Sequence, residues 1–252
     1  MTQLVDSHIQ IEKVSKSYHL GKTEIPVLRN ISFSVDHGEF VGIMGPSGSG
    51  KTTLLSIIAA LQSPSSGDII FDSKVKMSLM GQSALTRFRL ENIGLIFQSH
   101  NLFEALTAYE NIEAPLLLLP RTKTSRNSKD RREIVQDLME RLEITEQAGH
   151  LISELSGGQK QRVAVGRALA TNPSLVIADE PTGSLDTMTG RHVVDILRSL
   201  SKENQKTVLM VTHDPSYATG FDRVLSLRSG VLTQVSHPES EEAIFFGQKN
   251  DS

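Results

Sequence analysis

One eight-residue segment constrains the fold more than any other part of the chain. Residues 45–52 read GPSGSGKT and match the pattern G-x-x-x-x-G-K-[ST] at every fixed position. The segment follows an apolar run at residues 40–44. In this pattern the backbone N–H groups of a glycine-rich turn, together with the first turn of the following helix, surround phosphate groups. The sequence therefore predicts a strand, a phosphate-binding loop and a helix that starts near Lys51.

The residue types in this loop suit that task. Side chains at Gly48 or Gly50 would obstruct the approach of the backbone to the phosphates. Lys51 adds a positive charge for the β- and γ-phosphate oxygens, and Thr52 supplies a hydroxyl for Mg²⁺. A plain glycine-rich turn between a strand and a helix is the alternative reading. The expected nucleotide-binding residues here are Gly45, Pro46, Ser47, Gly48, Ser49, Gly50, Lys51, Thr52 and Thr53.

Apolar runs elsewhere indicate the fold class. Such runs end immediately before polar or glycine-rich turns at residues 40–44, 93–97, 175–178, 208–211 and 224–227. Continuous apolar runs are typical of strands buried on both faces of a parallel sheet. The expected fold is therefore α/β, with helices on both faces and ligand sites at the carboxyl ends of the strands. Residues 9–11 and 27–35 alternate instead and predict antiparallel strands, with a further strand near 67–71.

The chain divides into a core and an insertion. Helical patterns fill residues 101–170, where apolar residues at helical spacing form a stripe around Ile134, Leu138 and Leu142. We expect one domain over residues 1–236, with its core at about 1–98 and 171–236 and a helical subdomain at about 99–170. Residues 237–252 are polar and acidic apart from three apolar residues, and predict a poorly ordered tail.

Polar residues follow three of the predicted strands. Asp179 and Glu180 come directly after the run at 175–178, Gln98 follows 93–97, and His213 follows 208–211. Asp179 is expected to hold Mg²⁺ and Glu180 to act as the base for an attacking water. Gln98 could contact the Mg²⁺ or the water, and His213 the γ-phosphate. Solvated strand ends or turn residues would be the ordinary alternatives at each position.

A second glycine-containing segment lies at residues 155–159, which read LSGGQ. It stands before a helical pattern at 160–170 that stops at Asn172-Pro173. Small residues before a helix form an anion site, although the residues alone leave open which phosphate they would meet. The residues expected to bind are Ser156, Gly157, Gly158 and Gln159. Tyr18 follows the first predicted strand and could stack on adenine, or could be a core or surface aromatic.

Composition excludes several classes of protein. The formal net charge of −3 gives no general electrostatic reason to bind nucleic acid. Cysteine is absent, which removes disulfides and thiolate metal sites. The apolar run at 114–119 is far shorter than the roughly twenty residues of a membrane-spanning helix, and residues 1–13 lack the apolar centre of a signal peptide. At a membrane, another chain would have to supply the span.

Taken in order, these motifs resemble those of the nucleotide-binding subunit of ABC transporters over residues 9–230. The shared features are the phosphate loop, Gln98, the LSGGQ signature, the Asp179-Glu180 pair, the loop ending at Asp186, and His213. The resemblance implies a phosphate-loop NTPase core of RecA-like type that hydrolyses ATP with Mg²⁺. It also implies a homodimer in which each ATP lies between one copy's phosphate loop and the other copy's residues 156–159. Asp186 would belong to the same nucleotide site.

Within that family, three segments resemble the branch of macrolide exporters, lipoprotein-release ATPases and cyanobacterial glycolipid exporters. These segments are IFQSHNL at 96–102, GQKQRVA at 158–164 and ADEPTGSLD at 178–186. The branch implies export through a transmembrane permease, a peripheral location on the cytoplasmic face of the inner membrane, and a periplasmic adaptor reached through the permease. Residues 102–119 are the expected docking surface, with core packing of residues 116–119 as an equally good alternative. Glu104 and Ser153 stand where the branch often has proline.

Two alternatives to this function differ in the partner. One is a soluble ABC-type ATPase that acts on nucleic acid or ribosomes, although such proteins generally carry paired cassettes or a long coiled coil, and this chain shows no sustained heptads. The other is the ATPase of an importer.

Overall fold

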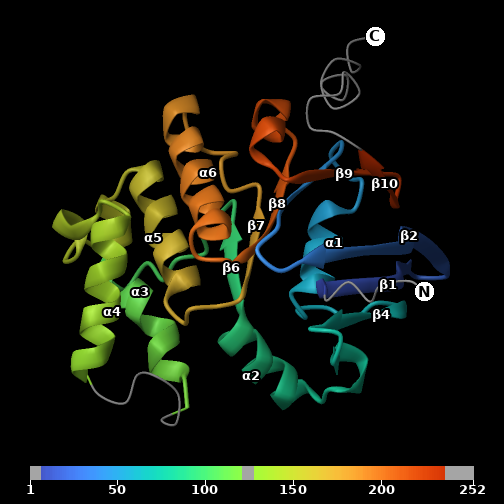
Figure 1. The fold of residues 1–252 in the computed structure, drawn as a ribbon, viewed down its shortest axis with the longest axis horizontal. Helices are drawn as coiled ribbons and strands as arrows, with labels where there is room; N and C mark the ends of the chain where they lie inside the picture. The colour runs from blue at the N-terminus through green and yellow to red at the C-terminus, as the bar shows by residue number, and fades with distance from the viewer. Residues whose placement is uncertain (1–6, 121–127, 236–252) are drawn as a thin grey trace.

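The computed structural model describes residues 7–120 and 128–235 (Figure 1). The expected tail at 237–252 lies outside the described residues. A central sheet separates a group of helices from a second, smaller sheet (Figure 1). The predicted fold class, an α/β phosphate-loop core with an antiparallel sheet and an inserted helical region, is confirmed.

The central sheet has six strands in the order β10-β9-β3-β8-β7-β6. Its strands are parallel except for β10, which runs antiparallel to β9. They comprise β3 (Phe40–Met44), β6 (Ile93–Phe97), β7 (Leu175–Asp179), β8 (Thr207–Thr212), β9 (Arg223–Arg228) and β10 (Val231–Val235). The apolar runs predicted β3 and β6 residue for residue and the next three to within one residue at each end. β10 was not predicted.

Successive residues of this sheet enter two different hydrophobic cores. In β8, Val208 and Met210 belong to a core shared with the helices on one face. Leu209 and Val211 belong to a second core on the other face, shared with α1 and the antiparallel sheet. Because both faces are covered, every position along β8 is buried, which explains why the sequence reads as a continuous apolar run.

The second sheet is antiparallel, in the order β2-β1-β4-β5. Its strands are β1 (Ser7–Leu20), β2 (Thr23–Asp36), β4 (Ser66–Phe71) and β5 (Val75–Lys76). β1 and β2 are longer than expected, so Tyr18 lies within β1 and not after it. Val14 is buried in the extension of β1, but most of the other added residues are partly or fully exposed, and their strand pairing rests on backbone hydrogen bonds with β2.

Helices cover the central sheet on both faces (Figure 1). They are α1 (Lys51–Ile58), α2 (Gln82–Asn92), α3 (Ala108–Leu118), α4 (Ser128–Arg141), α5 (Gly157–Leu169) and α6 (Thr187–Lys202). Short 3₁₀ segments occur at Met77–Leu79, Thr145–Gln147, Ile152–Glu154 and Pro215–Gly220. α2 was not predicted; it buries only Leu85, so its apolar periodicity is weak.

α3, α4 and α5 form the helical region (Figure 1). Val135, Leu138 and Met139 on α4 are buried, as the apolar stripe predicted. The exact limits of the core and the helical subdomain remain a prediction. Within 7–120 and 128–235, no helix combines the length and the apolar character needed to cross a membrane.

Candidate functional site

The carboxyl ends of four neighbouring strands bring the predicted residues to one edge of the central sheet. β3 and β8 end side by side, with Met44 opposite Thr212, and Asp179 of β7 lies opposite Phe97 of β6. The residues that follow these strands therefore meet at this edge, as the sequence predicted.

The phosphate loop connects β3 to α1. Gly50 is the N-cap of α1 and has φ of 103°, a conformation that side chains rarely adopt. A Cβ atom at Gly50 would lie 2.9 Å from Leu28 Cδ2 and 3.1 Å from the Val27 carbonyl oxygen. Glycine is thus required here both by dihedral angle and by the close approach of β2.

Lys51 is held inside its own loop. Its Nζ donates hydrogen bonds to the carbonyl oxygens of Gly45 at 2.8 Å and Pro46 at 3.0 Å. Burial lowers the pKa of this ammonium group, and the nearby carboxylates of Glu180 and Asp179 oppose that shift. The loop therefore fixes a buried positive charge beside two acidic residues, at the N-terminus of a helix, which favours an anion.

A cavity of about 400 Å³ opens above the loop. It is lined by Val27, Ser47, Gly48, Gly50, Lys51, Thr52, Thr53, Gln98, Asp179 and Glu180. All but one of these residues were expected from the sequence. Val27 was missed because it comes from β2 of the antiparallel sheet, and no local pattern marks it.

Asp179 is a half-buried carboxylate of this cavity. Burial raises its pKa, and the charge of Glu180 adds to that rise, while a hydrogen bond with the Thr52 hydroxyl and the charge of Lys51 lower it. Its Oδ1 is buried and makes no hydrogen bond within the described residues. A buried, unpartnered carboxylate oxygen beside a hydroxyl is a donor set that suits a hard cation such as Mg²⁺.

Glu180 is fixed by its backbone and by His213. Its φ is 46°, and its N–H donates to the Val211 carbonyl oxygen at 3.0 Å. Its Oε2 lies 3.1 Å from His213 Nδ1. An ionised carboxylate can only accept, so Nδ1 carries the proton in this bond. In this structure His213 therefore orients Glu180, a contact that the sequence did not predict.

Gln98 lies at the start of the segment that leaves the core for the helical region. Gly183 lies against the Gln98 amide: a Cβ atom at position 183 would be only 2.8 Å from Gln98 Nε2, so glycine there leaves space for the amide. Arg167 of α5 donates to the carbonyl oxygens of His100 and Asn101 at 2.9 and 2.5 Å. The loop that carries Gln98 is thus bonded directly to a helix of the inserted region.

The LSGGQ segment lies at the start of α5. The helix begins at Gly157, three residues earlier than predicted, so Gly157, Gly158 and Gln159 form its first turn. The physical reason is a capping box: Ser156 Oγ accepts from Gln159 N at 3.3 Å, and Gln159 Oε1 accepts from Ser156 N at 2.8 Å.

This segment borders a separate cavity of about 460 Å³. The cavity is lined by Glu143, Thr145, Glu146, Gln147, Ser156, Gly158, Gln159, Arg162 and Thr189. None of these residues lines the cavity above the phosphate loop. Ser156, Gly158 and Gln159 were expected from the sequence, and the other six lining residues were missed. Their place beside the segment depends on how α5, α6 and the residues after α4 pack.

Asp186 lies near the second cavity and caps α6. Its carboxylate accepts from the backbone N–H groups of Met188 and Thr189, each at 3.1 Å. It also accepts from the Thr189 hydroxyl at 2.6 Å, and these bonds lower the pKa of Asp186. Thr189 in turn packs against Gly158, where an added Cβ would be 2.6 Å from its methyl group. The structure thus gives Asp186 a capping role that supports the LSGGQ turn.

Tyr18 does not line the cavity above the phosphate loop. Its ring is 40% exposed, and its hydroxyl donates to Gln62 Oε1 at 2.7 Å. The Lys16 ammonium lies 5.3 Å from the ring centre. The role of Tyr18 in stacking on adenine stays a prediction.

Comparisons with known proteins agree with this arrangement. A family model described as ABC transporter matches residues 28–183. The chain is 42% identical to the uncharacterized ABC transporter ATP-binding protein MJ0796 of Methanocaldococcus jannaschii, over 88% of this chain and 94% of that protein. It is 39% identical to the lipoprotein-releasing system ATP-binding protein LolD of Desulfotalea psychrophila, over 88% of this chain and 96% of that protein.

The chain is also 42% identical to the macrolide export ATP-binding/permease protein MacB of Syntrophobacter fumaroxidans, over 92% of this chain but 31% of that longer protein. Among solved structures, the dimeric ATP-binding cassette MJ0796 in a post-hydrolysis state with ADP and Pi superimposes with a TM-score of 0.82 at 39% identity. That match covers 90% of this chain and 98% of the solved one. With the phosphate loop, the acidic pair and the LSGGQ turn in place, the chain belongs to the ABC transporter family, as one of its ATP-hydrolysing cassettes.

Proposed function

We propose that two copies of this chain close head to tail around two ATP molecules and thereby drive an export permease. The supporting observation is the separation of the two anion sites, which occupy different cavities with no lining residue in common. Both lie at the N-terminus of a helix, α1 and α5. A second copy in the opposite orientation would bring its LSGGQ turn to the first copy's phosphate loop and complete each site.

In this proposal Mg²⁺ is held by Thr52 and Asp179, with Gln98 beside them. The unpartnered, buried Oδ1 of Asp179 supports this choice, since a cation would satisfy it. When bound, Mg²⁺ neutralises charge on the β- and γ-phosphate oxygens. Lys51 contributes a second positive charge to the same phosphates. Its ammonium group would give up its hydrogen bonds to the Gly45 and Pro46 carbonyl oxygens and bond to the phosphates instead.

Glu180 is proposed as the general base. Its carboxylate takes a proton from water, the resulting hydroxyl oxygen bonds to the γ-phosphorus, and the bond from that phosphorus to the oxygen retained by ADP breaks. His213 holds the carboxylate in place through the 3.1 Å bond to Oε2. A neutral His213 has its single N–H on Nδ1 in this bond, so donation to the γ-phosphate would need a protonated ring or a changed tautomer.

Closure of the dimer is proposed to move the helical region, which would transmit the movement to the permease. The signature turn adds contacts to ATP only in the closed dimer, so ATP shifts the open-closed equilibrium by its differential affinity for the two forms. Arg167 joins α5 to the loop that starts at Gln98, which supports coupling between the nucleotide and the helices.

We place permease docking on residues 102–119. Leu116 packs into the core, whereas Phe103, Leu117 and Leu118 expose more than half of their surface. Exposed apolar side chains of this size are typical of an interaction surface when they cluster. The permease would hold the cassette on the cytoplasmic face of the inner membrane. By its resemblance to MacB and LolD, the complex would serve export, and a periplasmic adaptor would join through the permease.

The test is Glu180→Gln in the full chain. The amide keeps the size of the side chain and loses the base, so we expect normal ATP binding and turnover lowered about 10²–10⁴-fold. The unhydrolysed ATP should hold the variant as a dimer in size-exclusion chromatography. Glu12→Gln, an exposed residue on β1, is the matched control and should behave like the wild type. Near-normal phosphate release by the Glu180 variant would refute the role of Glu180.

Co-purification tests the partner. Recovery of the chain with a membrane protein supports the proposed permease. Salt-sensitive recovery with nucleic acid would instead favour a cassette that works without a membrane partner.

A further inference from the structure

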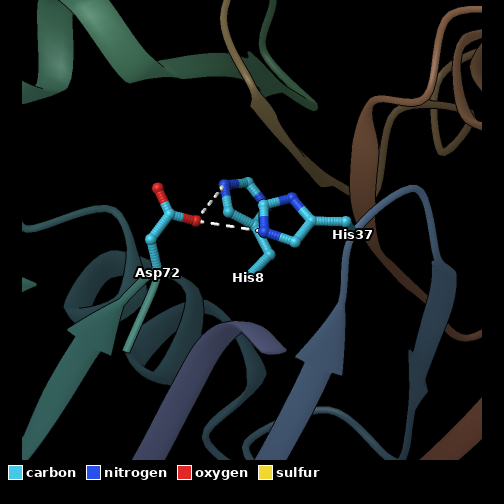
Figure 2. Close-up of side chains that lie close together, drawn as sticks. All are labelled: His8, His37 and Asp72. Atoms are coloured by element: carbon cyan, nitrogen blue, oxygen red, sulfur yellow. Dashed lines mark ion pairs between the residues drawn. The ribbon is translucent and has the colours of Figure 1, made fainter. Parts of the chain in front are cut away.

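Three side chains with metal-binding atoms converge at the edge of the molecule where the antiparallel sheet meets the central sheet. His8 lies in β1, His37 in the turn between β2 and β3, and Asp72 in the turn between β4 and β5. Figure 2 shows the carboxylate of Asp72 directed at both rings. Asp72 Oδ1 is 3.2 Å from His37 Nε2 and 3.9 Å from His8 Nε2, and all three atoms lie within 4.8 Å of one another.

Contacts around His8 are compatible with a proton on its Nδ1. Nδ1 lies 2.7 Å from Thr207 Oγ1, and Thr207 Oγ1 lies 3.2 Å from the Asp36 carbonyl oxygen. When Thr207 donates its one hydrogen to that carbonyl oxygen, it accepts from His8, and Nδ1 then carries the proton. In that tautomer His8 Nε2, which lies 3.9 Å from Asp72 Oδ1, has a lone pair.

The ring of His8 is almost fully buried, so His8 is the fixed member of the cluster. The Ser174 hydroxyl, 3.1 Å away, donates to the lone pair of Nε2. A metal-ligating histidine usually has its other ring N–H bonded to an oxygen, which is the place of Thr207 Oγ1 beside Nδ1 here; at Nε2 a metal ion would take the place of the Ser174 hydroxyl.

The other two groups have the freedom to complete a site. The side chains of His37 and Asp72 are about half exposed, 51% and 55%, while His8 is fixed. The Asp72 N–H donates to the His8 carbonyl oxygen at 2.9 Å, so the carboxylate and the buried ring are held by the same pair of strands. The two rings stack with centroids 4.5 Å apart and planes 21° apart. Because the lone pair of an imidazole nitrogen lies in the ring plane, the exposed His37 ring must turn out of this stack to direct its Nε2 at the same ion as His8.

We propose that His8 Nε2, His37 Nε2 and Asp72 Oδ1 bind one transition-metal dication such as Zn²⁺, with water in the remaining position. Bonds of about 2.0–2.2 Å in a tetrahedral arrangement place ligand atoms about 3.3 Å apart, so the separations of 3.2 to 4.8 Å need a modest contraction. The exposed His37 and Asp72 can supply that movement. Metal binding displaces the Ser174 bond. Two imidazoles and one carboxylate favour Zn²⁺, Co²⁺ or Ni²⁺ over Mg²⁺, which prefers oxygen ligands.

This site lies far from the ATP site. Thr207, which bonds His8, begins β8, whereas Thr212 at the other end of that strand lies beside the phosphate-loop edge. Five residue steps along a strand correspond to roughly 16 Å. The metal would join the β2–β3 and β4–β5 turns to the buried start of β1, and so clamp the antiparallel sheet to the core.

The test uses full-length protein without an affinity tag, freed of metal and nucleotide. Zn²⁺ is titrated by calorimetry, and Co²⁺ is followed by its visible absorption. We expect one ion per chain and the intense spectrum of tetrahedral Co²⁺. His37→Ala and Asp72→Asn should each weaken Zn²⁺ binding by at least about 100-fold, since losing even a second-shell partner costs about 10–100-fold. His19→Ala, an exposed histidine elsewhere on β1, is the matched control and should bind as the wild type does.

Thermal melting gives a second readout. Zn²⁺ at 100 times its Kd should raise the melting temperature of the wild type by about 5–10 °C and leave that of the two variants unchanged. Unaltered ATPase rates of His37→Ala without Zn²⁺ would show that the variant is folded. Equal Zn²⁺ affinity in the wild type and both variants would overturn the proposal. So would a wild-type Co²⁺ spectrum of only the weak, octahedral kind, which would mean that the three groups form a hydrogen-bonded cluster and no metal site.

Discussion

Replacing Asp179 with asparagine should move stability and nucleotide binding in opposite directions. Asp179 is a half-buried carboxylate whose pKa is raised by burial and by Glu180, and its buried Oδ1 has no hydrogen-bond partner within the described residues. A raised pKa means that the folded state disfavours the charged form. The native protein therefore carries a destabilising charge at this position, and Asp179→Asn removes it while the carbonyl of the amide can still accept from Thr52.

The dependence on pH follows from the direction of that shift. An aspartate in the unfolded chain has a pKa of about 3.9. Between that value and the raised pKa of the folded state, the folded protein keeps a proton that the unfolded chain has released. The free energy of unfolding therefore falls as pH rises through this window and remains lowered above it. Asparagine does not titrate. The difference in free energy of unfolding between Asp179→Asn and the wild type should therefore be absent below about pH 4 and reach a plateau near neutral pH.

The expected gain at the plateau is about 1 kcal/mol, within the range of single stabilising substitutions at functional sites. The size is limited because Lys51 and the Thr52 hydroxyl already offset part of the penalty. For a chain of this length, 1 kcal/mol corresponds to roughly 2–4 °C in melting temperature. Binding moves the other way: a non-hydrolysable ATP analogue with Mg²⁺, at 100 times Kd, should add about 2.7 kcal/mol to the wild type and far less to the variant.

The assay is thermal melting between about pH 4 and pH 8, with and without the analogue and Mg²⁺. Asp195→Asn, an exposed aspartate on α6, is the control and should change neither quantity. If Asp179→Asn is less stable than the wild type at neutral pH without nucleotide, the reasoning from burial is refuted. If it gains as much as the wild type from the analogue with Mg²⁺, Asp179 does not hold the cation.

Two further substitutions test the loop and the signature turn. Gly50 has φ of 103°, and a new Cβ there would lie only 2.9 Å from Leu28 Cδ2. Gly50→Ala should therefore lower the free energy of unfolding by about 2–4 kcal/mol, measured by denaturant unfolding. A loss below about 1 kcal/mol would contradict this contact. The control for Gly50→Ala is Gly21→Ala, with φ of 62° and no atom within 4 Å of the new Cβ, which should cost less. Ser156→Ala should remove the cap of α5, at about 1 kcal/mol, and spare ATP binding by the monomer while abolishing ATP-driven dimerisation and hydrolysis. Fluorescent-nucleotide titration and size-exclusion chromatography measure these effects, and loss of monomer ATP binding would argue against a site shared by two copies.

Periodicity and motif spacing account for what was predictable. The five parallel strands were located because burial on both faces leaves a continuous apolar run, as in β8. The phosphate loop, Asp179 and Glu180 followed from strand ends and from residue chemistry. α2 was missed because it buries only Leu85, and β5 because it is two residues long. The extension of β1 was missed because apolar residues are sparse along it, and β10 was missed as well.

The sequence by itself determined the fold class, the phosphate loop and the acidic strand end, because these features depend on residues close together in the chain. Only the tertiary structure decided which distant residues meet. It placed Val27 over the phosphate loop, directed His213 at Glu180, and gave the LSGGQ turn a cavity of its own. It also gathered His8, His37 and Asp72, whose spacing suggests no metal site, because pairing between strands brings their turns together. Contacts of this kind are set by strand order and sheet packing, which local sequence patterns do not encode.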